Sequence, residues 1–215
     1  MKYKAVIFDL DGVICHTDHY HYLAWKKLAE KLGVYFDERI NNQLRGVSRM
    51  DSLNIILKKW EGASLSEGEK VRMAESKNES YKELLNQMSP QDLSTEVKDT
   101  LDKLRRRGIL LAIGSSSKNA RFILNQIGLN DYFDAISDGN NITHSKPHPE
   151  VFLMAAEYLN INPSECLVVE DARAGIDAAK AAGMDSAAIG DAVGYPQAAY
   201  DLNAFAELLE ICSGV

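Results

Sequence analysis

A short apolar run near the start of the chain, residues 5–8, is followed at once by two carboxylates, Asp9 and Asp11. Four apolar residues in a row, two of them β-branched, predict a strand buried on both faces, as in parallel sheets covered by helices. Side chains alternate along an extended chain, so we expect Asp9 and Asp11 to face one point beyond the end of the strand. Open α/β sheets bind their ligands at that end.

The spacing of apolar residues changes from strand to helix after this turn and stays helical to about residue 90. Apolar side chains recur with a period of about 3.6 over residues 23–32, and further helical patterns cover 37–44, 48–60 and 71–88. The stretch contains no strand pattern. We therefore expect residues 16–90 to form an all-helical cap, inserted after the first strand and able to open and close over the two carboxylates.

Strand and helix patterns alternate from residue 94 to the end of the chain. Repeated strand–helix–strand order in one sheet gives parallel strands joined by right-handed crossovers. We therefore expect an α/β fold, in which a Rossmann-like, doubly wound parallel sheet forms a catalytic core from residues 1–15 and 91–215. After the first strand, the strands of this core are expected at residues 109–114, 134–136, 166–169 and, as the last one, 186–189.

The composition is that of a globular protein, with 46% hydrophobic and 26% charged residues in 215. No apolar run approaches the roughly 18 residues of a membrane span, so we expect no membrane association. The first residues enter a core strand, which leaves no room for a signal sequence, and the three cysteines lack a metal-type spacing. These features predict a cytoplasmic protein, which we expect to be monomeric.

The net charge of −7 argues against a nucleic-acid partner, because nucleic-acid binding depends on basic patches. It does not exclude a phosphorylated small molecule. A few local cations, helix N-termini and a divalent ion can hold phosphate on an acidic protein.

Polar residues follow three of the later strands. The serines at 115–117 offer hydroxyls and free backbone N–H groups to a phosphate, Lys146 lies on a loop, and Glu170 with Asp171 ends another strand. Each has an ordinary explanation by itself, because serines cap helices, most lysines are solvated and acids are common in turns. Together they would supply what a nucleophilic carboxylate needs, namely a phosphate cradle, a cation and metal ligands.

The order of these groups resembles the haloacid dehalogenase superfamily of phosphotransferases, in which Asp-x-Asp, Ser or Thr, Lys and paired acids follow successive strands. The resemblance implies that Asp9 attacks phosphorus to form an aspartyl phosphate, and that Asp11 gives and takes the proton of the substrate oxygen. Lys146 and the Ser115 hydroxyl would help to neutralise the phosphate. Phosphoryl transfer depends mainly on such positioning and neutralisation of charge.

The same resemblance implies a Mg²⁺ cofactor. Its ligands would be Asp9, the backbone carbonyl of Asp11, and Glu170 or Asp171, with phosphate oxygen and water completing the shell. Hard oxygen ligands and several carboxylates suit this ion.

Within that superfamily, nearly the whole length of the chain resembles the β-phosphoglucomutases, and the cap carries the distinguishing features. The matching segments are Tyr20-His21, Ala24-Trp25, Leu44 to Arg49 and Asp51-Ser52. The resemblance implies that β-glucose 1-phosphate and glucose 6-phosphate are interconverted through a β-glucose 1,6-bisphosphate. His21 would assist proton transfer, and Arg49 would bind the phosphate that is not being transferred. Thr17 is expected to join the catalytic group, and the remaining substrate-binding candidates are Trp25, Gly46, Val47, Ser48, Ser52, Lys77, Ser116, Ser117, Lys118 and Asn119.

Two other functions start from the same carboxylate. A phosphatase of the same fold would pass the phosphoryl group from Asp9 to water instead of to a sugar. A phosphoreceiver module would signal when its Asp is phosphorylated. The receiver is disfavoured, because a helical cap and the second acid at Asp11 would have no purpose in it.

Three histidines near the start of the chain, His16, His19 and His21, raise zinc as an alternative metal. On one helix their spacing prevents all three from converging, and the neighbouring carboxylates favour a harder ion. The chain also departs from the family pattern at His16, Arg45 and Ala172, where relatives have Asp, Lys and Ser. These departures leave cap closure and the choice of sugar open.

Overall fold

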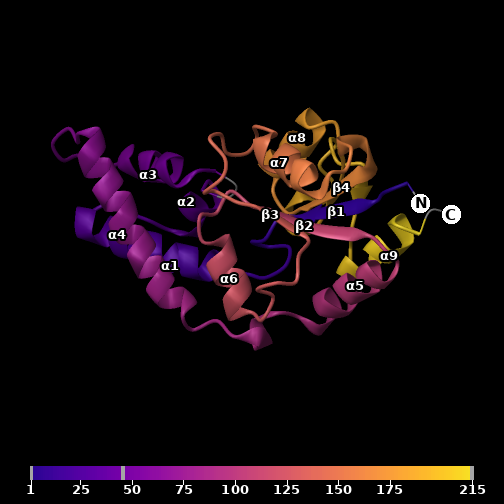
Figure 1. Ribbon diagram of the computed structural model, residues 1–215. Helices are drawn as coiled ribbons and strands as arrows, with labels where there is room; N and C mark the ends of the chain where they lie inside the picture. The colour runs from indigo at the N-terminus through magenta and orange to yellow at the C-terminus, as the bar shows by residue number, and fades with distance from the viewer. Residues whose placement is uncertain (1, 45–46, 214–215) are drawn as a thin grey trace.

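A six-stranded parallel sheet forms the centre of the molecule, in the order β3-β2-β1-β4-β5-β6 (Figure 1). The computed structural model describes residues 2–44 and 47–213. The strand order reverses on either side of β1, so β1 lies at the switch point where doubly wound sheets bind ligands. The predicted α/β class with a doubly wound parallel sheet is confirmed. The strands are β1 (Ala5–Phe8), β2 (Leu110–Gly114), β3 (Ala135–Ser137), β4 (Cys166–Glu170), β5 (Asp185–Ala188) and β6 (Tyr200–Asp201).

The register of the central strands brings their carboxyl ends to one edge. Phe8, the last residue of β1, pairs with Ile113 of β2 on one side and Val169 of β4 on the other. The residues that follow these three positions therefore meet beyond the sheet. Asp9 continues the ladder for one step, since its N–H donates to the Val169 carbonyl at 3.0 Å.

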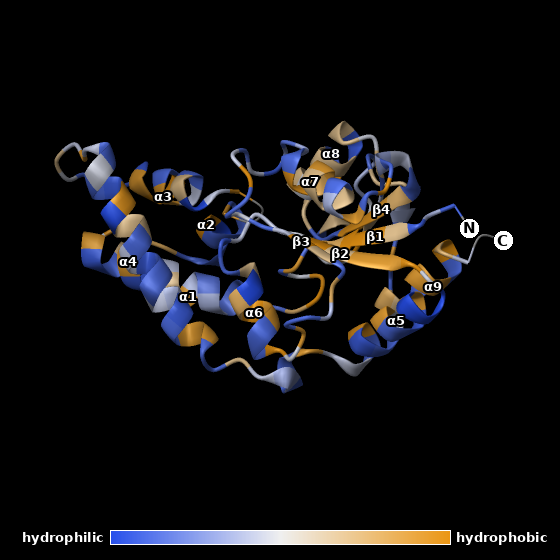
Figure 2. Ribbon diagram, in the orientation of Figure 1, coloured by the Kyte–Doolittle hydropathy of each residue, from blue (hydrophilic) through white to orange (hydrophobic). Residues whose placement is uncertain are grey.

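Both faces of the sheet are buried under helices. On one face Phe8 and Ile113 belong to the larger apolar core, and on the other Ile7 and Val168 pack with Phe152. The central strands are accordingly hydrophobic throughout (Figure 2), which is why each of them appeared as an unbroken apolar run. The core helices are α5 (Thr95–Arg106), α6 (Ala120–Gln126), α7 (Glu150–Leu159), α8 (Arg173–Ala181) and α9 (Leu208–Ile211).

One prediction about the sheet was wrong. The strand expected at 186–189 is β5, at 185–188, but it is not the last, because β6 pairs with it in parallel. β6 contains only two residues and pairs through Tyr200 and Asp201. A ladder this short leaves no run of alternating or continuous apolar residues for a sequence pattern to reveal.

Helices α1 (Asp18–Leu32), α2 (Glu38–Asn42), α3 (Arg49–Leu57) and α4 (Glu67–Leu85) lie together beyond the carboxyl edge of the sheet (Figure 1). They enclose an apolar cluster of their own, centred on Trp25, Leu53 and Ile56. The inner ends of α1 and α4 continue into the core of the sheet through Ala24 and Tyr81. We propose that residues 16–90 act as the cap predicted from the sequence. Among the described residues of this stretch none is in a strand.

The ends of the cap helices follow local capping signals. Gly33 ends α1 in the left-handed conformation, with φ of 67°. Ser48 begins α3, its hydroxyl accepting a hydrogen bond from the Asp51 N–H at 3.1 Å, and so fixes the position of Arg49. Thr17 precedes α1, but its hydroxyl does not cap the helix. Within residues 2–44 and 47–213, no helix is both long and apolar enough to cross a membrane.

Candidate active site between the sheet and the cap

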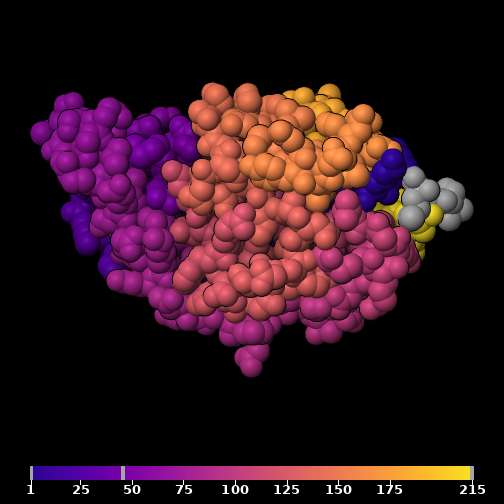
Figure 3. Space-filling model, viewed as in Figure 1, coloured from indigo at the N-terminus to yellow at the C-terminus, as the bar shows by residue number. Residues whose placement is uncertain are grey.

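A cavity of about 480 Å³ lies between the carboxyl edge of the sheet and the cap. In Figure 3 the purple atoms of the cap directly abut the orange atoms of the core. Thr17 lies behind the cavity wall, in contact with Asp11, and Gly46 and Arg45 fall outside the described residues. The predicted site residues that line the cavity are Asp9, Asp11, His21, Trp25, Val47, Ser48, Arg49, Ser52, Lys77, Ser115, Ser116, Ser117, Lys118, Asn119, Lys146, Glu170 and Asp171.

Lys146 joins two of the carboxylates on the sheet side. Its Nζ lies 2.5 Å from Asp9 Oδ1 and also forms an ion pair with Glu170, and all three side chains are buried. Burial lowers the pKa of Lys146, but the charges of Asp9 and Glu170 outweigh that effect and raise it above its usual value. The lysine is therefore a cation held against the predicted nucleophile.

Asp9, Glu170 and Asp171 each offer a carboxylate oxygen, and these oxygens lie within 4.8 Å of one another. Burial, followed by the charges of Asp9 and Glu170, raises the pKa of Asp171 to about 8. Three carboxylates this close repel one another, and a divalent cation between them would relieve that repulsion. The donors are all hard oxygens, so the cluster fits Mg²⁺. The proposed contribution of the Asp11 backbone carbonyl stays a prediction.

Two glycines make room for these acids. Gly12 has φ of +84°, and a Cβ at this position would overlap the carboxylate of Asp171. A Cβ at Gly175, in the first turn of α8, would overlap the carboxylate of Glu170. Glycine at both positions therefore lets the backbone approach the cluster closely, a requirement that the sequence alone did not reveal.

Asp11 has the properties of a group that exchanges protons near neutral pH. The Thr17 hydroxyl donates a hydrogen bond to Asp11 Oδ1. Burial, and then the charge of Asp9, raise the pKa of Asp11 to about 7, while the Thr17 hydrogen bond acts in the opposite direction. A general acid or base is most effective when its pKa lies near the working pH. The Thr17 hydroxyl thus orients Asp11 instead of capping α1.

The serine loop after β2 differs from the expectation in one respect. Its backbone N–H groups were predicted to be free for phosphate, but Ser115 N–H donates to the Ser137 carbonyl at 3.0 Å and Ser117 N–H donates to the Ser115 hydroxyl at 3.2 Å. The first bond extends the pairing of β2 with β3, and the second lies within the loop that leads to α6. The buried Ser116 hydroxyl has no hydrogen-bond partner in the part of the chain that the structure describes. It is therefore a donor that a bound phosphate could use.

The cap contributes basic side chains to the cavity, of which Lys77 is buried and Arg49 and His21 are half-buried. Lys77 Nζ lies 3.0 Å from His21 Nδ1 and between the rings of Trp25 and Tyr81, at 4.5 and 4.6 Å from their centroids. Burial and then the charge of Arg49 lower the pKa of Lys77 to about 7. Burial followed by Lys77 and Arg49 holds the pKa of His21 well below its usual range. An anion bound here would stabilise the charged forms of all three groups.

The sequence model of the haloacid dehalogenase-like hydrolases matches residues 3–183. The chain belongs to this family. Curated relatives include the β-phosphoglucomutase of Bacillus subtilis, which is 41% identical over 201 residues, covering 93% of this chain and 88% of the relative. A fructose-1-phosphate phosphatase of Escherichia coli is 32% identical, covering 86% of this chain and 95% of the relative. A phosphorylated carbohydrates phosphatase of Thermotoga maritima is 31% identical, and the match covers 85% of this chain and 82% of the relative.

Among solved structures, β-phosphoglucomutase from Clostridium difficile superimposes with a TM-score of 0.91. It is 42% identical and the match covers 98% of this chain and 96% of that one. The similarity therefore extends through the sheet and the cap together. The predicted resemblance to the haloacid dehalogenase superfamily, and within it to the β-phosphoglucomutases, is confirmed.

Among the residues that line the cavity of this haloacid dehalogenase-like protein but were not recognised from the sequence, Asn78 and Tyr81 make contacts with predicted site residues. Asn78 accepts a hydrogen bond from the Asn119 side chain at 2.9 Å, which links the cap to the core. Tyr81 lies against His21, with ring centroids 4.0 Å apart. Tyr81 lies four residues after Lys77 and three after Asn78 on α4, spacings that place it beside each of them, and that pattern was the available signal. His16 and His19, in contrast to His21, are exposed.

Proposed function

We propose that the protein is a β-phosphoglucomutase, interconverting β-D-glucose 1-phosphate and D-glucose 6-phosphate through β-glucose 1,6-bisphosphate. The observation that carries this proposal is that one cavity has the Asp9–Lys146 pair on its sheet wall and Arg49 with Lys77 on its cap wall. A mutase must hold one phosphate at the nucleophile and a second phosphate elsewhere. The 41% identical relative named a β-phosphoglucomutase supports the same conclusion.

The reaction starts from enzyme phosphorylated on Asp9. The sugar 6-hydroxyl oxygen attacks phosphorus, Asp11 takes the hydroxyl proton, and the bond between phosphorus and the Asp9 oxygen breaks. After the bisphosphate turns around, an Asp9 oxygen attacks the 1-phosphate. The bond from phosphorus to the sugar oxygen breaks, and Asp11 returns its proton to that oxygen. Glucose 6-phosphate leaves, and the aspartyl phosphate is restored with every atom accounted for.

The sheet wall would neutralise the phosphate that is being transferred. Lys146 and the Ser115 hydroxyl supply positive charge and a hydrogen bond from this chain. Asp9, the Asp11 carbonyl, Glu170 and Asp171 would hold Mg²⁺, which when bound would offset the charge of the carboxylates and of the phosphate oxygens. Thr17 would keep the Asp11 carboxyl in place for proton transfer.

The cap wall would hold the other phosphate. Arg49 presents a guanidinium suited to two parallel charge-assisted hydrogen bonds, and Lys77 adds a donor on the same wall. The free Ser116 hydroxyl would add a donor from the serine loop of the core. The Nδ1 of His21 would keep Lys77 in position. His21 would also assist the proton transfer that Asp11 carries out. The remaining sugar and phosphate contacts are proposed to come from Trp25, Gly46, Val47, Ser48, Ser52, Ser117, Lys118 and Asn119.

Phosphorus NMR tests the proposal. The protein is incubated with Mg²⁺, β-glucose 1-phosphate and a trace of the 1,6-bisphosphate, with an Asp9→Asn sample as the control. Glucose 6-phosphate should accumulate only with the unmodified protein. Accumulation of free phosphate would favour a phosphatase, which is the activity named for the two relatives that are 31% and 32% identical. That the enzyme is monomeric and cytoplasmic stays a prediction, and size-exclusion chromatography can check the first part against 23.9 kDa.

A further inference from the structure

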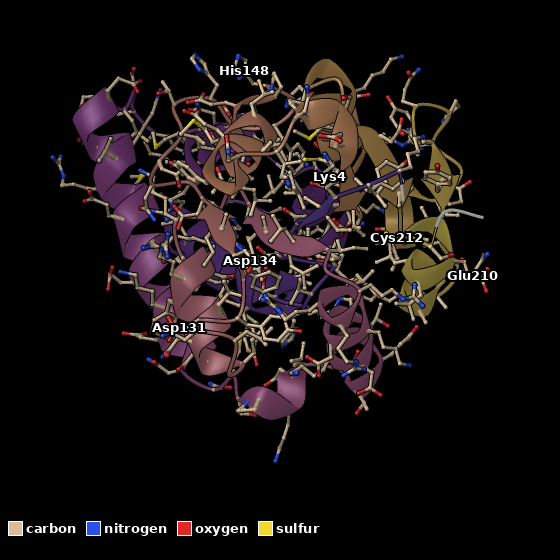
Figure 4. The ribbon with its side chains drawn as sticks, turned by 45° about the vertical axis from the view of Figure 1, so that its right-hand side comes forward. Lys4, Asp131, Asp134, His148, Glu210 and Cys212 are labelled. Atoms are coloured by element: carbon tan, nitrogen blue, oxygen red, sulfur yellow. The ribbon has the colours of Figure 1, made fainter. Side chains whose placement is uncertain are left out.

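A second group of metal-binding side chains lies outside the cavity, on the loop between β3 and α7. His144, His148 and Glu150 each offer a ligand atom, and these atoms lie within 4.8 Å of one another. The two histidines lie on either side of Lys146 in the sequence, whereas Glu150 is the first residue of α7. Figure 4 shows His148 at the periphery of the molecule. The group is therefore open to solvent and to ions.

The distances from the Glu150 carboxylate to the two histidines are close to those around a tetrahedral metal ion. Glu150 Oε2 is 3.0 Å from His144 Nδ1 and 3.9 Å from His148 Nδ1, and the two imidazole rings have centroids 4.6 Å apart. Zinc bonds to nitrogen and carboxylate oxygen of about 2.0–2.1 Å, at a tetrahedral angle, place two ligand atoms about 3.3 Å apart. The two measured separations lie on either side of this value.

The backbone of the loop already orients the carboxylate of Glu150. Its Oε1 accepts the Thr143 N–H and its Oε2 accepts the His144 N–H, each at 2.8 Å. Oε2 is also hydrogen-bonded to His144 Nδ1, at 3.0 Å, and a metal between these two atoms would replace that bond while keeping the one from the backbone N–H. His148 Nδ1 accepts the Glu150 N–H at 3.3 Å, a long bond that a metal would displace. The two backbone N–H bonds to the Glu150 carboxylate are of the kind that orients metal ligands.

We propose that His144, His148 and Glu150 form a second metal site, which binds Zn²⁺ or a similar borderline transition-metal ion with water as the fourth ligand. Two imidazoles and one carboxylate suit zinc, whereas Mg²⁺ prefers oxygen ligands throughout. The acid cluster of the cavity offers oxygen donors only and therefore prefers Mg²⁺ to zinc. This proposal does not depend on the proposed mutase activity.

The site would act on the loop that carries the catalytic lysine. The loop lines a second cavity of about 660 Å³, which also includes Ser48 and Asp51 at the start of α3. A metal held by His144 and His148 would link the residues before and after Lys146 in the loop. This loop lies where the cap faces the core. We expect the loop to lose mobility when the ion is bound.

Isothermal titration with Zn²⁺ tests the site, using untagged protein in excess Mg²⁺. His144→Ala and His148→Ala should each weaken one binding event at least tenfold. His19→Ala is the matched control, because His19 is also an exposed histidine, and it should leave that event unchanged. All three variants keep the acid cluster, so zinc that binds there cancels in the comparison. Isotherms of the His144 and His148 variants that superimpose on the His19 control would overturn the proposal.

Imidazole NMR gives an independent readout without any substitution. In long-range proton–nitrogen spectra of the unmodified protein, Zn²⁺ should shift the ring nitrogen signals of His144 and His148 and leave those of His19 in place. Signals of His144 and His148 that remain fixed when zinc is bound elsewhere would likewise exclude the site.

Discussion

The two walls of the cavity carry opposite charges, and burial opposes both. On the sheet wall, burial and mutual repulsion raise the pKa of Asp11 to about 7 and of Asp171 to about 8. On the cap wall, burial and repulsion between cations lower the pKa of Lys77 to about 7. Each wall is thus costly to keep charged by itself. A ligand with a divalent cation at one end and a phosphate at the other would relieve both, which is what a magnesium-dependent mutase of a bisphosphate requires.

Removing Asp9, the proposed nucleophile of the sheet wall, should have the largest effect. Asp9→Asn keeps the size of the side chain but replaces a carboxylate with an amide, which is a poor nucleophile. We expect turnover to fall by about a thousandfold or more, measured as glucose 6-phosphate formed. Circular dichroism should show an unchanged fold. Residual activity within about tenfold of the unmodified enzyme would contradict a covalent role for Asp9.

Removing the cation of the cap wall should affect only the reactions that use a second phosphate. Charged hydrogen bonds are typically worth about 1.5–3 kcal/mol, so Arg49→Ala should slow isomerisation by roughly ten- to a hundredfold. Phosphorylation of Asp9 by a small donor such as acetyl phosphate should change far less, because that donor does not reach the cap.

The comparison of the two assays decides the role of Arg49. Equal losses in both would mean that the residue supports the cap structure as a whole. Isomerisation at the original rate would remove it from the site.

The sheet wall was more predictable from the sequence than the cap wall. Its acids, serines and lysine each follow a buried strand, and parallel strands bring their carboxyl ends to one edge. The hydrogen bonds that occupy the Ser115 and Ser117 N–H groups could not be predicted, because the first depends on β3 pairing beside β2 and the second on how the serine loop folds. β6 was missed because two residues carry no periodic signal.

The cap wall depends on contacts between helices that lie far apart in the sequence. Lys77 on α4 meets His21 on α1, and Asn78 meets Asn119 of the core. Helical periodicity predicts which residues share one face of α4, but it does not tell which helix that face meets. The role of Arg49 was therefore reached through resemblance, whereas the packing around Lys77 required the structure.

The acids of the sheet wall should make the stabilising effect of Mg²⁺ depend on pH. Burial raises the folded-state pKa of Asp11 and Asp171, so their contribution to stability is full below about pH 4 and is lost as the pH rises through 7 to 8. Mg²⁺ would bind the deprotonated carboxylate of Asp171, and its charge would also favour the deprotonated form of the nearby Asp11, so we expect it to restore that loss. At pH 8.5 we expect the melting temperature to be about 4–8 °C higher with Mg²⁺ than with EDTA, which corresponds to roughly 2 kcal/mol in the free energy of unfolding.

At pH 5.5 the same acids are mostly protonated in the folded protein, so the difference between Mg²⁺ and EDTA should nearly vanish. Differential scanning fluorimetry at both pH values measures it. A Mg²⁺ effect of equal size at pH 5.5 and 8.5 would show that the Asp171 carboxylate is not one of its ligands.

The contact between the two walls should have the smallest effect. Asn78→Ala removes the acceptor of the Asn119 side-chain amide, and both residues are buried. A buried donor without a partner costs about 1–3 kcal/mol, but opening of the cap would let water satisfy it and would reduce this cost. We therefore expect the free energy of unfolding to fall by roughly 1 kcal/mol, which would lower the melting temperature by about 2–4 °C. We also expect KM for β-glucose 1-phosphate to rise a few-fold while kcat changes little.

Asn54→Ala is the matched control for this last change, because Asn54 is also a helical asparagine but is exposed on α3. Both substitutions replace asparagine with a better helix former, so the gain in helix propensity is the same. Only Asn78→Ala should make the cap easier to open, which hydrogen exchange of the α4 amides can measure. Faster exchange in both variants would trace the effect to helix packing, whereas unchanged exchange and KM in Asn78→Ala would show that the hydrogen bond does not hold the two walls together.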